Sequence, residues 1–434
     1  MTSADATHGR SAVSAPVRPT PTGTRGRASL GLPAFWLLLV LLAIGAWRVS
    51  TLVGTAFTSY PVATVLAAVL FTLYAVPFVI VARSVDFLER EPPLLLAAAL
   101  GWGGMVATTT AIAGNGAVHD LLAKLVSPAF AASWGPAISA PAIEELLKTL
   151  GVVVVVLVAR KQVNSVVDGA VYGAFVGLGF QVVEDFIYAV NAVAIAGRGD
   201  HVGPVIVTFF LRGFLGGLWS HTLFSALAGA GIAYFVVRQN RPLWRRLAVA
   251  FGCLLGAWAF HFVWNSPWLS DGLGYGGLGV LAALLVKGIP PFLMVMLLLR
   301  AASGSEADFY LAELVGDPDV ATSKELAALR TGRRRMAARR YAYARCGRKG
   351  ANAVRMLQKA QAELAVELSR GGDRVPELRE AVLVQRRRLI AFGHPEAADP
   401  PDRRRAWGSW AVGIGLSAAV AIAAAIAINA LGGS

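Results

Sequence analysis

The chain has only two cysteines among its 434 residues, Cys253 in an apolar stretch and Cys346 in a basic one. Such a pair excludes a disulfide framework and a thiolate metal site. The sequence also lacks an internal repeat and a glycine-rich phosphate-binding loop. Charged residues make up only 15% of the chain, whereas 56% of the residues are hydrophobic. This balance is unlike that of a soluble enzyme and is typical of a protein that crosses a membrane several times.

Long apolar runs fill residues 31–300, and one more follows near the C-terminus. A membrane-spanning helix needs about 20 apolar residues. Segments of this length are 33–54, 61–82, 93–114, 136–159, 166–197, 205–237, 246–268, 276–300 and 407–431. The fifth and sixth are longer than one span needs, which predicts a tilt, a kink or a partly re-entrant start. We therefore expect an all-α polytopic membrane protein with an eight-helix intramembrane core at residues 31–300 and a C-terminal transmembrane helix within 407–434.

The distribution of Lys and Arg predicts the orientation of these spans. Basic residues occur in alternate loops, as in RSVDFLEREPP, ARKQVNS and VRQNRPLWRR, whereas the loops between them, TSY, His119–Trp134, GRGDH and SPWLSDGLGYGG, are poor in them. Residues 1–30 are basic, rich in Ser, Thr, Pro and Gly, and have no apolar core of a signal peptide, so we expect a disordered tail. By the positive-inside rule, this is a multi-pass protein of the cell membrane whose N-terminus and residues 301–406 are cytoplasmic.

The segment 301–406 is basic and holds about half of the net charge of +14, in runs such as RRRMAARRYAYARCGRK. Leu, Ala and Val recur among these charges at helical spacing. We expect a cytoplasmic helical segment that its Lys and Arg side chains hold near anionic lipid. No nucleic-acid-binding motif is present and aromatic residues are sparse, so no nucleic-acid partner is expected.

Three charged residues stand at the start of an otherwise apolar run, in PAIEELLKTLGVVVVVLV. On a helix, Lys148 lies one turn from both Glu144 and Glu145, so one cation faces two carboxylates. A charge inside a membrane costs roughly 2.5 kcal/mol or more. The group is therefore either an ion pair that locks helices together or part of a polar site.

Polar residues in three later spans favour a site. Glu184, His221, His261 and Asn265 each lie within an apolar run. With a rise of 1.5 Å per residue, Glu144, Glu184, His221 and His261 all lie about 10 to 20 Å below the outer surface. Four antiparallel helices would therefore bring them into one layer.

The positions of these residues around their helices also favour a common site. Gly169, Gly173 and Gly177 form a small-residue stripe, and Glu184 lies on the same side of its helix, which predicts that it points into a close helix contact. His261 and Asn265 also share a face, because they are four residues apart. Asp185 lies about 100° from Glu184 and receives no role.

Two mechanisms of water activation fit these residue types. A Zn²⁺ held by two histidines and a glutamate would lower the pKa of a bound water to about 7, and a nearby glutamate would take its proton. Without a metal, Glu145 would act as general base, and histidine and asparagine would hold the oxyanion. The residue types fit both the metal-dependent and the metal-free mechanism.

The order of these motifs resembles that of the PrsW family of intramembrane proteases, which is related to the CAAX-prenyl endopeptidase and bacteriocin-processing superfamily. The resemblance rests on EELLK, FQVVE with Phe180 and Glu184, His221, and HFVWN, and covers roughly residues 31–300. The upstream DFLEREPP also resembles a polar loop of this family. Glu184 stands where the prenyl-endopeptidase branch has histidine, which favours the PrsW branch.

The resemblance implies an intramembrane endopeptidase that cleaves membrane-anchored proteins near the outer face, for example an anti-sigma factor. It implies Glu145 as base, Glu144 and Lys148 as residues that fix its charge and position, and Asn265 as an orienting residue. Glu184, His221 and His261 would be metal ligands, with Zn²⁺ as the expected ion, or oxyanion partners. The alternative is a non-catalytic membrane scaffold or a transporter of small solutes or protons, since buried Glu and His chains also serve as relays.

Overall fold

The computed structural model describes residues 31–160, 162–270, 272–394 and 396–398, and within these ranges every regular element is a helix. The predicted all-α fold is therefore confirmed. The N-terminal tail 1–30 and the last predicted span, 407–431, lie outside the described residues.

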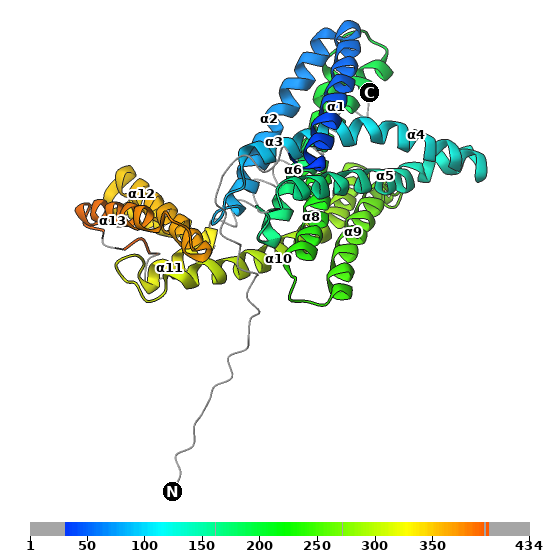
Figure 1. The fold of residues 1–434 in the computed structure, drawn as a ribbon. Coiled ribbons are helices and arrows are strands. Elements are labelled where there is room, and N and C mark those ends of the chain that lie inside the picture. Colours follow the sequence, from blue (N-terminus) through cyan, green and yellow to red (C-terminus); the bar gives the residue numbers. More distant parts are fainter. Residues whose placement is uncertain (1–30, 161, 271, 395, 399–434) are drawn as a thin grey trace.

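Eight long helical segments lie in the predicted core (Figure 1). They are α1 (Pro33–Ser59), α2 (Pro61–Val85), α3 (Pro93–Gly101) continued by the π-helix η1 (Trp102–Ala107) and α4 (Thr108–Leu125), α5 (Pro128–Val158), α6 (Val166–Ala196), α7 (Gly203–Thr208) continued by η2 (Phe209–Gly216), η3 (Gly217–Trp219) and α8 (His221–Val237), α9 (Leu243–Asn265), and α10 (Gly276–Leu311) after the short η4 (Gly272–Gly274).

Seven of these segments are long and apolar enough to cross a membrane within the described part of the chain. The eighth, α5, has three charged residues in its middle, Glu144, Glu145 and Lys148, and all three are buried inside the bundle. The described chain is thus a multi-pass membrane protein, and the three charged residues of α5 are shielded by the neighbouring helices.

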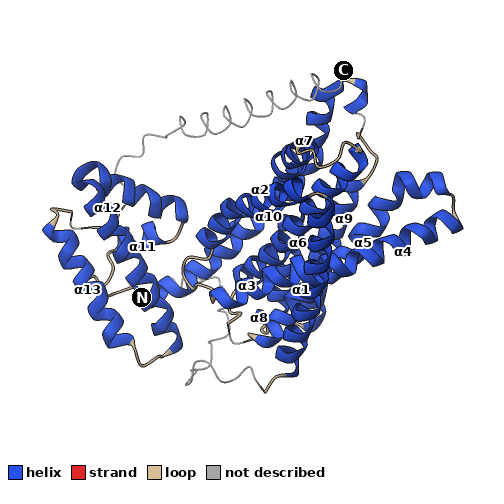
Figure 2. Ribbon diagram, turned by 90° about the horizontal axis from the view of Figure 1, so that it is seen from above, coloured by secondary structure: helices blue, strands red, loops and turns tan. Residues whose placement is uncertain are grey.

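A separate helical unit follows the core. It consists of η5 (Ala312–Leu314), α11 (Ser323–Leu329), α12 (Gly332–Arg370) and α13 (Val375–Ala391), and both ribbon views place it on the opposite side of the bundle from the α4–α5 hairpin (Figures 1 and 2). Leucines such as Leu329, Leu357 and Leu389 form its core. Helix α10 runs without a break through residue 300, so the predicted start of the cytoplasmic segment falls inside a helix.

The loop between α2 and α3 joins this unit to the core. Phe87 and Leu88 pack into the hydrophobic cluster of the helical unit, and the Arg335 guanidinium lies 3.7 Å from the centre of the Phe87 ring. Glu89 accepts hydrogen bonds from Tyr310 and Arg370. The polar loop DFLEREPP is therefore a docking element between the two parts of the molecule.

The glycine stripe of α6 sets the closest helix contact near the charged layer. A Cβ added at Gly173 would lie 2.0 Å from the carbonyl oxygen of Ser225, and one at Gly177 would lie 2.2 Å from that of His221. Only hydrogen fits between these backbones. As the stripe predicts, α6 packs directly against α8, which places the Glu184 side of α6 beside His221.

The sixth predicted span is broken rather than continuous. The π-helix η2 and the 3₁₀ turn η3 separate α7 from α8, and Ser220 has non-helical backbone angles (φ −113°, ψ −133°). Gly213, Gly216 and Gly217 lie in or beside this break, where residues without a side chain ease irregular backbone. His221 thus becomes the first residue of α8.

The predicted outer loop His119–Trp134 is helical, and that expectation was wrong. Helix α4 continues to Leu125, and α5 already begins at Pro128. Ser127 caps α5 by accepting a hydrogen bond from the Phe130 N–H at 3.1 Å, and proline at the first helical position needs no N–H partner. The two helices therefore form a hairpin that projects from the bundle (Figure 1).

Replacement of Gly173 tests the α6–α8 contact. We expect Gly173→Ala to lower the free energy of unfolding by about 1 to 3 kcal/mol, because the methyl group must push two helix backbones apart. Thermal unfolding in detergent measures the effect. The matched control is Gly252→Ala in α9, where an added Cβ meets no atom within 4 Å. Equal stability of the two variants would refute the close contact.

Candidate active site

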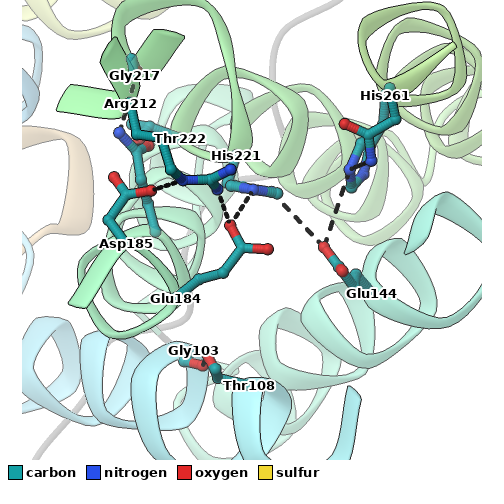
Figure 3. Close-up of polar contacts among 12 residues, drawn as sticks. Gly103, Thr108, Glu144, Glu184, Asp185, Arg212, Gly217, His221, Thr222 and His261 are labelled. Carbon is teal, nitrogen blue, oxygen red and sulfur yellow. Dashed lines mark hydrogen bonds and ion pairs between the residues drawn. The ribbon is translucent and has the colours of Figure 1, made fainter. Parts of the chain in front are cut away.

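The structure brings the seven residues singled out in the sequence into one cluster, which comes from four helices. Helix α5 supplies three of them, α6 and α8 one each, and α9 two. They are Glu144, Glu145, Lys148, Glu184, His221, His261 and Asn265. Figure 3 shows Glu184 and Glu144 pointing towards the two histidines from their separate helices.

Lys148 is fully buried and pairs with only one of its two neighbouring carboxylates. Its Nζ donates to Glu145 Oε1 at 2.5 Å and to His221 Nδ1 at 2.9 Å. The ammonium also lies 4.7 Å from the centre of the Phe180 ring. Glu144, in contrast, turns towards other partners, so the two adjacent glutamates have different surroundings.

Each histidine is oriented by a carboxylate. His261 Nδ1 lies 2.8 Å from Glu145 Oε1, and His221 Nε2 lies 3.0 Å from Glu184 Oε2. We assign the ring proton to these nitrogens, because an ionised carboxylate can only accept a hydrogen bond. The opposite nitrogens, His261 Nε2 and His221 Nδ1, then carry the lone pairs.

Glu144 faces both of these lone pairs. Its Oε1 accepts a hydrogen bond from Asn115 at 2.8 Å, whereas its Oε2 is buried and has no hydrogen-bond partner. That Oε2 lies 3.9 Å from His221 Nδ1 and 3.9 Å from His261 Nε2. A buried, unsatisfied carboxylate oxygen is costly unless another group compensates it. A cation between the three atoms would do so.

The residues Glu144, His221 and His261 therefore fit a metal ion, and they form a candidate metal group within the described residues. Carboxylates that bond the second nitrogen of a ligating histidine are the usual support of such a site. Lys148 Nζ and Asn265 Nδ2 already donate to the two lone-pair nitrogens, at 2.9 and 3.1 Å. Both donors would have to release these nitrogens when a metal binds.

Glu184 lies outside this group and has a partner that sequence reasoning missed. Arg212 donates from Nη2 to Glu184 Oε2 and from Nε to Asp185 Oδ1, both at 2.6 Å (Figure 3). Its guanidinium also lies 3.8 Å from the centre of the Tyr188 ring. Arg212 is the one arginine in the long apolar run 205–237. A single charge in such a run could have indicated from the sequence that Arg212 has a buried acidic partner. Asp185, left without a role, is its second carboxylate partner.

A cavity of about 420 Å³ opens beside the cluster. Glu144, Glu184, His221, His261 and Asn265 line it, whereas Glu145 and Lys148 do not. Further lining residues come from α4, α5 and α9, from the broken segment and from α10, and include Asn115, Ser139, Arg212, Ser220, Trp264 and Leu284. A substrate that enters this cavity would therefore meet Glu144 before Glu145.

Residues 91–297 match the PrsW family intramembrane metalloproteases. Over these residues the chain is similar to the PrsW family. The resemblance seen in the sequence is thereby confirmed, and the matched residues contain all seven members of the cluster and Arg212. The PrsW family is a family of intramembrane proteases, and the matched residues include the buried Glu144–His221–His261 group of this chain. No curated protein and no solved structure matches the chain.

Arg212 can be tested by its effect on stability. We expect Arg212→Met to lower the free energy of unfolding by about 2 kcal/mol, because Glu184 and Asp185 lose their common cation. The Arg212 side chain is 33% exposed, so the loss is smaller than for a fully buried pair. Thermal unfolding in detergent should show that part of the lost stability is recovered when Arg212→Met is combined with Asp185→Asn. No recovery in the double variant would argue against charge compensation.

Proposed function

We propose that this protein is a multi-pass endopeptidase of the cell membrane that cleaves membrane-anchored protein substrates inside or beside the bilayer. The observation that carries the proposal is the unsatisfied Glu144 Oε2, which faces two oriented histidines in a membrane-embedded cavity. A structural ion pair alone does not require such an arrangement. A signalling protein such as an anti-sigma factor is the kind of substrate that we propose.

We further propose that Glu144, His221 and His261 hold a Zn²⁺ ion. Glutamate and imidazole are common zinc ligands, and a catalytic site keeps one position open. When bound, zinc would acidify a water molecule and polarise the peptide carbonyl. This ligand set differs from the one expected from sequence, which had Glu184 in place of Glu144.

Glu184 is then the proposed general base. One of its oxygens, Oε2, is held by His221 and Arg212, and the side chain lines the cavity. The other oxygen is free of any hydrogen bond in the described structure and can accept a proton from water. Asn265 lines the same cavity, and we propose that its side-chain amide N–H stabilises the negative charge that develops on the carbonyl oxygen of the scissile peptide bond.

Glu145 and Lys148 act as positioning residues in this scheme. Glu145 holds the Nδ1 proton of His261, and Lys148 balances the charge of Glu145. Neither side chain lines the cavity. The assignment of Glu145 as the base, expected from the resemblance, is therefore less favoured by the geometry.

Glutamine variants separate these roles. We expect Glu144→Gln to abolish cleavage while the protein stays folded, because Glu144 has no cationic side chain that depends on its charge. Glu145→Gln should lower thermal stability as well, because it leaves the buried Lys148 without its anion. Cleavage is measured by comparing intact and cleaved membrane proteins in cells that express each variant. Stability is measured as the unfolding temperature of each purified variant. Unchanged fragments with Glu144→Gln would favour the scaffold or transporter alternative.

Metal content tests the ligand set. Elemental mass spectrometry of the purified protein should find near-stoichiometric zinc, which is lost in Glu144→Gln, His221→Ala and His261→Ala. The matched control is Glu184→Gln, which should keep the metal and lose cleavage. Zinc kept in Glu144→Gln and lost in Glu184→Gln would restore the ligand set expected from sequence. Full cleavage by metal-free protein would instead make Glu144 the base of a glutamate-type protease.

The orientation in the membrane is also a proposal. We propose that the N-terminus and residues 301–406 are cytoplasmic, because the loops between spans carry basic residues on that side. Reporter fusions should give a cytoplasmic signal after Asn240 and an external signal after Ser270. The opposite pair of signals would place the cavity nearer the cytoplasmic face and exclude cleavage near the outer one.

A further inference from the structure

Helix α10 changes character where it leaves the core. Leu293 and Leu297 are 52% and 66% exposed, as expected for side chains that face lipid, and Arg300 follows one turn later. Ser305 accepts a hydrogen bond from Arg238 at 3.2 Å, and Arg238 directly follows the end of α8. These contacts place the segment from Arg300 to Ser305 at the level where the neighbouring span ends, which is the membrane surface.

A groove of about 450 Å³ lies on this part of α10. Leu297, Arg300, Ala301, Gly304, Ser305 and Asp308 line it from α10, and Arg330, which directly follows α11, lines it from the helical unit. These α10 positions recur every three or four residues and so share one face of the helix. A Cβ at Gly304 would meet no atom within 4 Å, so the middle of the groove is open.

The charges of the groove favour an anion. Its one carboxylate, Asp308, is already paired with Arg330 at 2.8 Å. Arg300 is exposed and has no acidic partner in the described structure. Arg238 adds a further positive charge next to Ser305. Three arginines against one aspartate leave a formal charge of +2 at the membrane surface.

We propose that this groove binds the headgroup phosphate of an anionic phospholipid, with an acyl chain along Leu297 and Leu293. A free phosphate would use the arginines but not the exposed leucines, so the combination favours a lipid. Arginine forks match phosphate oxygens, and Ser305 offers a hydroxyl group to the same ligand. Because Arg300 and Arg330 come from the two parts of the molecule, a bound lipid bridges the membrane core and the helical unit.

Native mass spectrometry of the full-length protein in detergent tests the groove, with phosphatidylglycerol as the lipid probe. We expect Arg300→Gln combined with Arg330→Gln to weaken the tightest phosphatidylglycerol binding about 30-fold, since each basic residue near a membrane surface contributes roughly 5-fold. The matched control removes the same charge from exposed positions of α12, with Arg340→Gln and Arg348→Gln. It should change binding less than about 2-fold. Equal weakening in both double variants would overturn the proposal in favour of a diffuse charge effect.

A second variant fills the groove without altering charge. Gly304→Leu should weaken phosphatidylglycerol binding while the unfolding temperature stays near that of the wild type, because the added side chain projects into open space. Unchanged lipid binding in this variant would contradict a site in the groove. Inorganic phosphate and phosphatidylcholine serve as comparison ligands. Competition by millimolar phosphate would assign the groove to free phosphate, and equally tight phosphatidylcholine would show that the headgroup charge plays no part.

Discussion

The buried ammonium group of Lys148 is the interaction on which the site depends. It has no access to solvent, so its charge must be balanced by a nearby anion, which is Glu145 one turn away on the same helix, and His221 accepts a further hydrogen bond from it. Through Glu145 it supports the orientation of His261, and by direct contact it settles which nitrogen of His221 keeps its lone pair. The buried Lys148–Glu145 ion pair thus links α5 to α8 through His221 and to α9 through His261.

As a consequence, the two adjacent glutamates have different surroundings. Glu145 contacts Lys148 and His261 and does not line the cavity. Glu144 lies about 100° away around the helix axis, lines the cavity, and directs an oxygen that has no hydrogen-bond partner towards both histidines. Of these two neighbouring carboxylates, only that of Glu144 lines the cavity. The rest of the cluster repeats this pattern, since Arg212 holds Glu184 while Glu184 still lines the cavity.

Backbone geometry makes these contacts possible. Gly173 and Gly177 let α6 and α8 approach closely, and the break at Ser220 ends the irregular segment directly before His221. If residues 205–237 formed one straight helix, Arg212 and His221, nine residues apart, would lie about 13 Å apart along its axis. The π-helical and 3₁₀ turns instead let both side chains reach Glu184. Irregular backbone inside a membrane is tolerated where it lines a polar cavity, as this segment does.

The amino-acid sequence by itself determined the helical fold, the position of the eight core segments and the identity of seven polar residues that meet in the membrane. Hydrophobic length, helical periodicity and the scarcity of charge are local properties, and the cost of burying a polar group marks each such residue even when its partner is unknown. Only the tertiary structure decided which residues pair. The presence of Glu144 rather than Glu145 in the cavity lining, the pairing of Arg212 with Glu184 and Asp185, and the extension of α4 and α5 into a hairpin depend on side-chain directions and helix crossings. Those come from contacts between segments far apart in the chain, and no spacing within one segment encodes them.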